Sequence, residues 1–103
     1  MKVIKTVIMD AIDRDYIQFL HFEMNSYKNI LSYILLEKTK GYEYSLENYK
    51  HFMTEYKEAE IKYNIMVVEF VSKYAPEFHG NTDYTVQYNF ESCEMVIYRK
   101  EDN

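Results

Sequence analysis

Residue types that define several common protein classes are scarce in this chain of 103 residues. It has two Gly and one Pro, too few for the many tight turns of a β-sandwich or β-barrel. Its one cysteine, Cys93, allows neither an intramolecular disulfide nor a cysteine zinc site, which fits a reducing cytoplasm. The only arginines are Arg14 and Arg99, and the formal net charge is −5. We therefore expect no basic surface that binds nucleic acid directly.

Long apolar runs and catalytic motifs are also missing. Runs such as Ile65-Met66-Val67-Val68 are too short to cross a bilayer, so we expect no membrane association. There is no nucleophile elbow, phosphate-binding loop or dinucleotide fingerprint. No Glu is followed three residues later by His, as a di-iron site in a helix bundle requires. Cys93 lies between Glu91 and Glu94, not in the electropositive surroundings of a reactive thiolate, and is interpreted as a small apolar residue. We expect no enzymatic activity, no metal and no cofactor.

Hydrophobic residues are abundant, at 48% of the chain, and include twelve Tyr and six Phe. This fraction excludes intrinsic disorder, and the length allows one domain, 1–103, with a modest core. Lys, Asn, Ile and Tyr together exceed a third of the residues, a bias typical of low-GC coding sequences in a bacterium or its phage.

Two stretches carry apolar residues three and four positions apart, the heptad pattern of paired helices. The first helix is expected over 12–38, capped by Asp10 or Asp13 and stopped by Gly41. The second is expected over 45–75, capped by Ser45 and stopped by Pro76. Together they predict an antiparallel helical hairpin. Their seam residues are Ile17, Leu20, Met24, Tyr27, Leu31 and Ile34 in the first helix, and Tyr49, Phe52, Tyr56, Ala59, Tyr63, Met66 and Phe70 in the second.

Strand patterns stand at both ends of the chain. Residues 3–9 are mostly β-branched, which predicts a short edge strand or an irregular lead-in to the first helix. After a loop over 76–83, period-two alternation predicts a β-hairpin of strands 84–90 and 94–99. The fold class is therefore α+β: a long antiparallel helical hairpin with the C-terminal β-hairpin packed on it.

The register of that β-hairpin follows from where the chain reverses. A reversal at Glu91-Ser92 places Tyr88 opposite Met95 and Val86 opposite Ile97, so that these four share one apolar face. Since Glu-Ser is not a favoured two-residue turn, a longer loop is the alternative. On the second helix, Glu69 and Lys73 are four apart and suited to an ion pair.

Tyrosine is the main functional signal. Tyr49, Tyr56 and Tyr63 recur every seven residues and are expected in the core, as is Tyr27. Apolar residues outside the seams either form a protein interface or are exposed because the domain is thin. The candidate partner-binding residues are Tyr16, Tyr33, Ile61 and Tyr74. We expect a homodimer that pairs two helical hairpins into a four-helix bundle, with Tyr33 and Ile61 at the contact, or an obligate complex with another protein.

These features favour a noncatalytic protein-binding module, such as an adaptor, assembly factor or inhibitor, that docks through its Tyr-rich helix surface. The alternative is an acidic, phage-encoded inhibitor of a defence protein that mimics nucleic acid. In that hypothesis carboxylates stand in for phosphates, at Glu55, Glu58, Glu60 and Glu69.

The segment Phe90-Glu91-Ser92-Cys93-Glu94-Met95, which follows two amphipathic helices and a strand, also suggests a family. It resembles the C-terminal strand pair of the CXXX repeat peptide modification system proteins, small accessory proteins found beside peptide maturases in clostridia. The resemblance implies a third function, that of a noncatalytic partner of a peptide-modifying maturase, and implies no catalytic residues.

Overall fold

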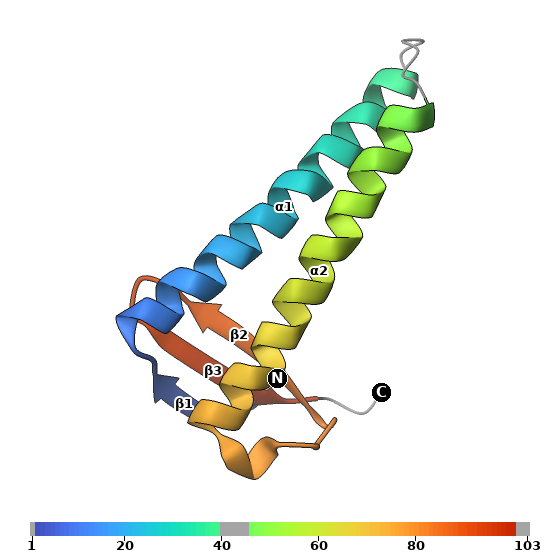
Figure 1. Cartoon of the computed structure of the whole chain (residues 1–103). Helices are drawn as coiled ribbons and strands as arrows, with labels where there is room; N and C mark the ends of the chain where they lie inside the picture. Colours follow the sequence, from blue (N-terminus) through green and yellow to red (C-terminus); the bar gives the residue numbers. More distant parts are fainter. Residues whose placement is uncertain (1, 40–45, 101–103) are drawn as a thin grey trace. The chain divides into compact units, whose positions relative to one another are not determined.

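The elements of the chain follow the predicted order. In a computed structural model, residues 2–39 and 46–100 are described, and they confirm the α+β class, the helical hairpin and the C-terminal β-hairpin (Figure 1). The predicted stop at Gly41 and cap at Ser45 lie outside the described residues. The elements are β1 (Lys2–Ile8), α1 (Ala11–Thr39), α2 (Leu46–Tyr74), the 3-10 helix η1 (Pro76–Phe78), β2 (Tyr84–Asn89) and β3 (Glu94–Arg99).

The chain divides into two compact units, and both long helices contribute to each. The hairpin unit comprises Phe19–Asn64, and the sheet unit comprises Met1–Gln18 together with Ile65–Asn103.

In the hairpin unit, α1 and α2 run side by side in opposite directions (Figure 1). Among the described residues of this unit, the buried hydrophobic ones are all seam positions: Leu20, Leu31, Ile34 and Ala59. The rings of His21 on α1 and Tyr63 on α2 lie 5.7 Å apart, so the two helices are in direct contact there. The seam tyrosines are half-buried, because two helices form a layer too thin to enclose a long side chain completely.

The sheet unit contains a three-stranded antiparallel sheet with the order β1-β3-β2. The N-terminal strand is confirmed and lies at an edge, paired with β3. The predicted register of the β-hairpin is also confirmed, with Val86 opposite Ile97 and Tyr88 opposite Met95. Ile4 interrupts the pairing of β1, because the register shifts by one residue between Val3 and Lys5.

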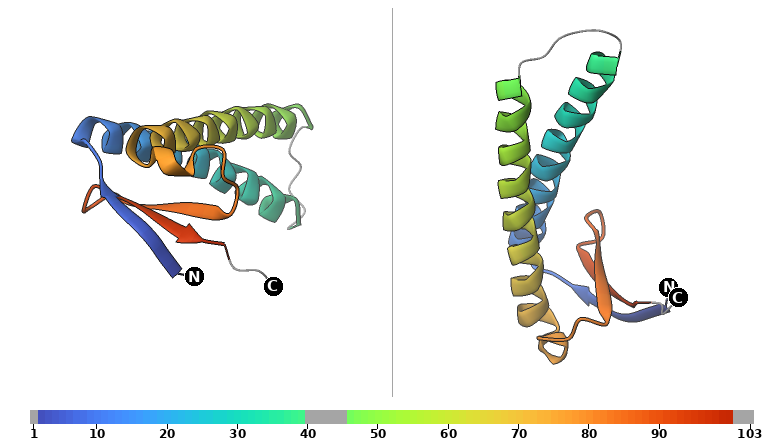
Figure 2. Two further views of the ribbon diagram at one scale, coloured as in Figure 1. Left: turned by 90° about the horizontal axis from the view of Figure 1, so that it is seen from below. Right: turned by 90° about the vertical axis from the view of Figure 1, so that its right-hand side faces the viewer.

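One face of this sheet is covered by the first turns of α1 and the last turns of α2 (Figure 2). Met95 and Ile97 on the central strand are fully buried on this face. The helices contribute Ile17, Phe70 and Val71 to the buried residues of the unit. Burying an aliphatic side chain of this size contributes about 1.5–3 kcal/mol, so the middle strand anchors the sheet to the helices.

The turn of the β-hairpin differs from the two-residue reversal and takes the longer form. β2 ends at Asn89, which pairs with Glu94, so residues 90–93 form a four-residue loop and Phe90 belongs to the loop instead of the strand. Cys93 closes this loop in the left-handed conformation, with φ 58°. Because the last pair of the ladder is Asn89 with Glu94, β2 is one residue shorter than predicted.

The start of α1 shows which of the two candidate residues caps the helix. The carbonyl of Asp10 accepts a hydrogen bond from the N–H of Arg14 at 3.0 Å, so the helix begins directly after Asp10. Asp13 is therefore a first-turn residue and not the cap. α2 ends at Tyr74, and Pro76 opens the short helix η1 inside the segment predicted as loop. Among the described residues, no helix has the length and apolar character needed to span a membrane.

Candidate protein-interaction surface

The outer face of α1 in the hairpin unit is apolar and exposed. Phe19 and Phe22 are 61% and 71% exposed, and Tyr33 and Leu36 are also more than half exposed. Each of the four stands two residues after a seam residue, which is about 200° around the helix. They therefore lie on the side of α1 that faces away from α2. We call these four residues the outer stripe.

The outer stripe has a polar centre. Ser26 and Asn29 occupy the intervening positions of the same heptad pattern, and both the Phe19–Phe22 pair and the Tyr33–Leu36 pair flank them. The Ser26 hydroxyl donates to the Phe22 carbonyl at 2.8 Å, so it is satisfied within the helix. Phe22 and Tyr33 are eleven residues apart, about 17 Å along the helix axis. The surface therefore offers two apolar contacts separated by small polar residues.

The structure does not bring Tyr33 and Ile61 together. Both are exposed, but Ile61 stands two residues after the seam residue Ala59 and so lies on the outer face of α2. The outer faces of two paired helices point in opposite directions. A single flat contact therefore reaches only one of the two residues. Phe22 and Leu36, like Tyr33, each follow a seam residue of α1 by two positions. Counting two positions on from every seam residue would have predicted both from the sequence.

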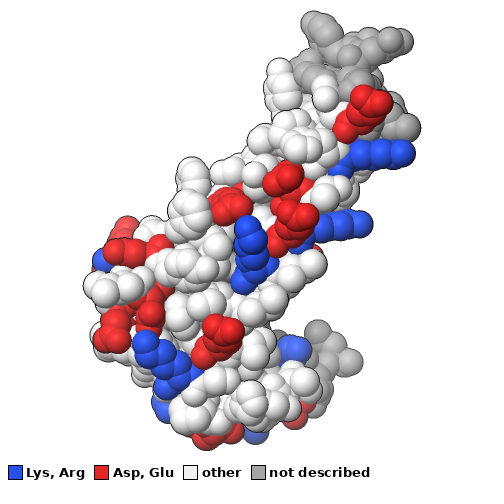
Figure 3. Space-filling view, viewed as in Figure 1, with Lys and Arg blue, Asp and Glu red and all other residues white. Residues whose placement is uncertain are grey.

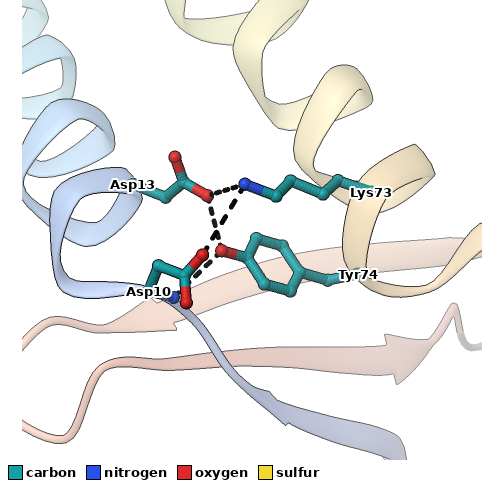
Figure 4. A network of polar contacts seen from close by, with 4 residues as sticks. All are labelled: Asp10, Asp13, Lys73 and Tyr74. Carbon is teal, nitrogen blue, oxygen red and sulfur yellow. Dashed lines mark hydrogen bonds and ion pairs between the residues drawn. The ribbon is translucent and has the colours of Figure 1, made fainter.

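The other two candidates belong to the sheet unit and differ from each other. Tyr16 is half exposed on α1. Tyr74 at the end of α2 is part-buried, and its hydroxyl is used inside the chain (Figure 4). It accepts a hydrogen bond from the N–H of Asp10 at 2.9 Å and donates to Asp13 Oδ2. Of the two, only Tyr16 presents a large free surface.

Asp13 joins the start of α1 to the end of α2. Its Oδ2 atom accepts from Lys73 Nζ at 2.6 Å as well as from the Tyr74 hydroxyl, and Lys73 also lies 3.8 Å from Asp10 (Figure 4). Lys73 thus pairs with α1 and not with the predicted partner, Glu69. In a capping box, the carboxylate three residues after the cap accepts directly from the N–H of the cap residue. Here Tyr74 stands between the two, so its hydroxyl links Asp10 N–H to Asp13.

These contacts shift the pKa values of all three side chains in the direction that preserves the network. The hydrogen bonds from Lys73 and then from Tyr74 lower the pKa of Asp13, with desolvation opposing them. The hydrogen bond to Asp13 raises the pKa of Lys73. Burial, followed by the hydrogen bond to Asp13, raises the pKa of Tyr74. Near neutral pH the carboxylate, the ammonium and the phenol therefore all keep the protonation state that the contacts require.

The four predicted acidic residues do not all share one face of α2. Glu58 and Glu60 are two residues apart on α2, so they point to different sides of the helix. Glu60 accepts a hydrogen bond from the Tyr56 hydroxyl at 3.0 Å, which raises the pKa of that phenol. Glu55 is half-buried, and Glu69 belongs to the sheet unit. On the face seen in Figure 3, blue basic side chains stand between the red acidic ones along α2.

The residues with metal-binding or nucleophilic potential are dispersed. Among the described residues, no three His, Cys, Asp or Glu side chains are grouped as metal ligands. His79 forms a hydrogen bond with Ser72 at 2.7 Å. Cys93 is half-buried in the β-hairpin loop, where Arg14 donates to the neighbouring carbonyl of Phe90 at 3.1 Å. The loop that carries Cys93 is thus joined to α1 through Arg14.

Comparison with protein-family models, with curated proteins and with solved structures finds no match for this chain. The evidence on function is therefore the surface itself.

Proposed function

We propose that this chain is a noncatalytic protein-binding module that docks on a partner protein through the outer stripe of α1. The observation that carries the proposal is the exposure of Phe19, Phe22 and Tyr33 on one helix face. Aromatic residues are enriched at the centres of protein interfaces, because they bury a large area with few rotatable bonds. An exposed apolar stripe on a small acidic protein is costly in water unless a partner covers it.

The shape of the stripe indicates the kind of partner. Its members follow heptad positions, which is the spacing that an amphipathic helix of another protein meets when it packs along α1. The small residues between the two apolar pairs let such a helix approach closely. The nucleic-acid mimic is less well supported, because lysines interrupt the acidic residues and Glu58 and Glu60 diverge.

Serine substitutions at Phe22 and Tyr33 test the proposal. Both residues are exposed, so the double variant should keep its free energy of unfolding within about 1 kcal/mol. Its affinity for the partner should fall at least about tenfold, since central aromatic anchors each contribute more than 1 kcal/mol to binding. Titration of the purified partner, identified first by crosslinking to the intact protein, measures the loss.

Ile61→Ser is the matched control. Ile61 is 57% exposed, close to the 58% of Tyr33, but lies on the outer face of α2. Binding should survive this change. Equal losses for both variants would place the contact elsewhere and contradict the assignment to α1. A steep loss of affinity with salt, unaffected by the serine variants, would favour the nucleic-acid mimic instead.

A further inference from the structure

The two edges of the sheet are protected very differently. An edge strand carries unpaired backbone N–H and C=O groups, and proteins block such edges with bulges and with charged side chains, above all Lys. β1 has both devices: the bulge at Ile4, and the lysines Lys2 and Lys5. β2 has neither, because Tyr84–Asn89 contains no charged residue, no Pro and no Gly, and its register with β3 is continuous.

The backbone groups on the open side of β2 are identified by the ladder. Lys100 N–H donates to the Asp83 carbonyl at 3.0 Å, so Asp83 and Lys100 form a hydrogen-bonded pair. Hydrogen-bonded and non-bonded pairs alternate along antiparallel strands. Thr85 and Gln87 therefore bond to β3, while the N–H and C=O groups of Tyr84 and Val86 point away from it.

The surface beside the open edge of β2 is mainly neutral. A shallow hollow of about 550 Å³ lies over β2 and the central strand β3. Its lining consists of Gln87, Tyr88 and Asn89 of β2, Val96 and Tyr98 of β3, Gln18 of α1, and Phe90 and Glu91 of the β-hairpin loop. Glu91 is the only charged residue of this lining, so the side chains of an incoming strand would meet mainly neutral groups there.

We infer that β2 is a strand-addition site for a second copy of this chain, which pairs its own β2 in antiparallel fashion to form a six-stranded sheet. A two-fold axis at Val86 places this residue opposite Val86 of the second copy. The backbone N–H and C=O groups on the open side of one β2 then face those on the open side of the other. The same register sets Tyr84 against Tyr88 and Thr85 against Gln87, which are aromatic and polar cross-strand pairs. No charges oppose each other, and in a chain with a net charge of −5 such a neutral segment is suited to self-association.

This dimer differs from a four-helix bundle and does not use the outer stripe. The dimer contact involves the sheet unit alone. The inference therefore goes beyond the proposed function, and either one can be wrong without the other. Because both copies would use the same edge in this two-fold contact, it also explains why β2 lacks the bulge and the lysines that protect β1.

A pair of charge variants tests the register. Thr85→Lys with Gln87→Lys places like charges opposite each other twice in the dimer, whereas Thr85→Lys with Gln87→Glu places opposite charges there. Both side chains lie on the sheet face opposite Met95 and Ile97, so the two variants should have similar monomers, as circular dichroism can check. Light scattering and sedimentation of the full chain should show a dimer that is at least about tenfold weaker for the Lys/Lys variant than for the Lys/Glu variant.

The unmodified chain supplies a second measurement. Hydrogen exchange at the Val86 amide should slow as the concentration of the protein rises, because this N–H becomes bonded only in the dimer. A monomer at every concentration, or equal association of the two charge variants, would overturn the inference. So would a dimer that Tyr33→Ser abolishes, since that result assigns self-association to α1.

Discussion

The hydroxyl of Tyr74 has two partners from the start of α1: it accepts from Asp10 N–H and donates to Asp13. Removing it leaves a helix-start N–H and a carboxylate each short of one hydrogen bond. We expect Tyr74→Phe to lower the free energy of unfolding by about 1–2 kcal/mol, measured by urea denaturation.

Tyr84→Phe is the matched control for this change. Each tyrosine packs its ring edge-on against a phenylalanine, Tyr74 against Phe70 and Tyr84 against Phe78. Within the described part of the chain, however, the Tyr84 hydroxyl forms no hydrogen bond. Its loss should change the free energy of unfolding by less than about 0.5 kcal/mol. Similar effects of the two variants would mean that the Tyr74 hydroxyl does not stabilise the helix start.

The side chain of Cys93 disfavours the backbone conformation that this residue adopts. At φ 58° a Cβ atom is strained by about 1 kcal/mol or more, and glycine removes that strain. Cys93→Gly should therefore be more stable than Cys93→Ala by about 1 kcal/mol, since both lack the sulfur and differ in the Cβ atom.

Ser92 provides the comparison, because its φ is not positive. There the order should reverse, with glycine less stable than alanine, because glycine loses more backbone entropy on folding. Thermal unfolding of the four variants measures both differences. The same order at the two positions would contradict a left-handed Cys93.

At the scale of the elements, the two faces of α1 should contribute unequally to stability. Leu31 in the seam is 7% exposed, and Leu36 in the outer stripe is 53% exposed. Leu31→Ala should cost about 2–4 kcal/mol, because it leaves a cavity between the helices. Leu36→Ala should cost less than about 1 kcal/mol. Urea denaturation of both variants is the measurement, and equal costs would show that the seam is not the contact between α1 and α2.

The whole molecule should be sensitive to acid through two tertiary ion pairs. Asp13 has a lowered pKa because of its hydrogen bonds from Lys73 and Tyr74, and Glu77 has a lowered pKa because of its contact with Lys5. A carboxylate with a lowered pKa in the folded state stabilises the fold above its unfolded pKa, about 3.9 for Asp. That stability is lost as the pH falls through the lowered value.

The difference in unfolding free energy between the wild type and Asp13→Asn should therefore be largest and constant above about pH 5 and shrink below about pH 4. Urea denaturation over a series of pH values measures it. Asp15→Asn is the control, because Asp15 forms an exposed pair with the adjacent Arg14, and exposed pairs contribute little. An Asp13→Asn difference that stays constant in acid would contradict the role given to the carboxylate.

Much of the fold is determined by the sequence alone, because its information is local. Period-three-and-four spacing indicates the helices and their seams, and period-two alternation indicates β2 and β3. The pairing of Val86 with Ile97 and of Tyr88 with Met95 follows because a shift of one residue would turn the apolar side chains away from the helices. The exposure of Tyr33 and Ile61 was also predictable, since both lie outside the seams.

The tertiary structure decides whatever depends on residues far apart in the chain. Lys73 has Glu69 four residues away, yet it pairs with Asp13, sixty residues away, because the end of α2 lies beside the start of α1. β1 pairs with β3, so β3 is the central strand and β2 lies at the open edge of the sheet. The residue pattern of β1 or of β2 alone does not determine this order. Local periodicity determines which face of an element is apolar, but only the packing of the elements determines which of those faces and edges are covered and which remain for a partner.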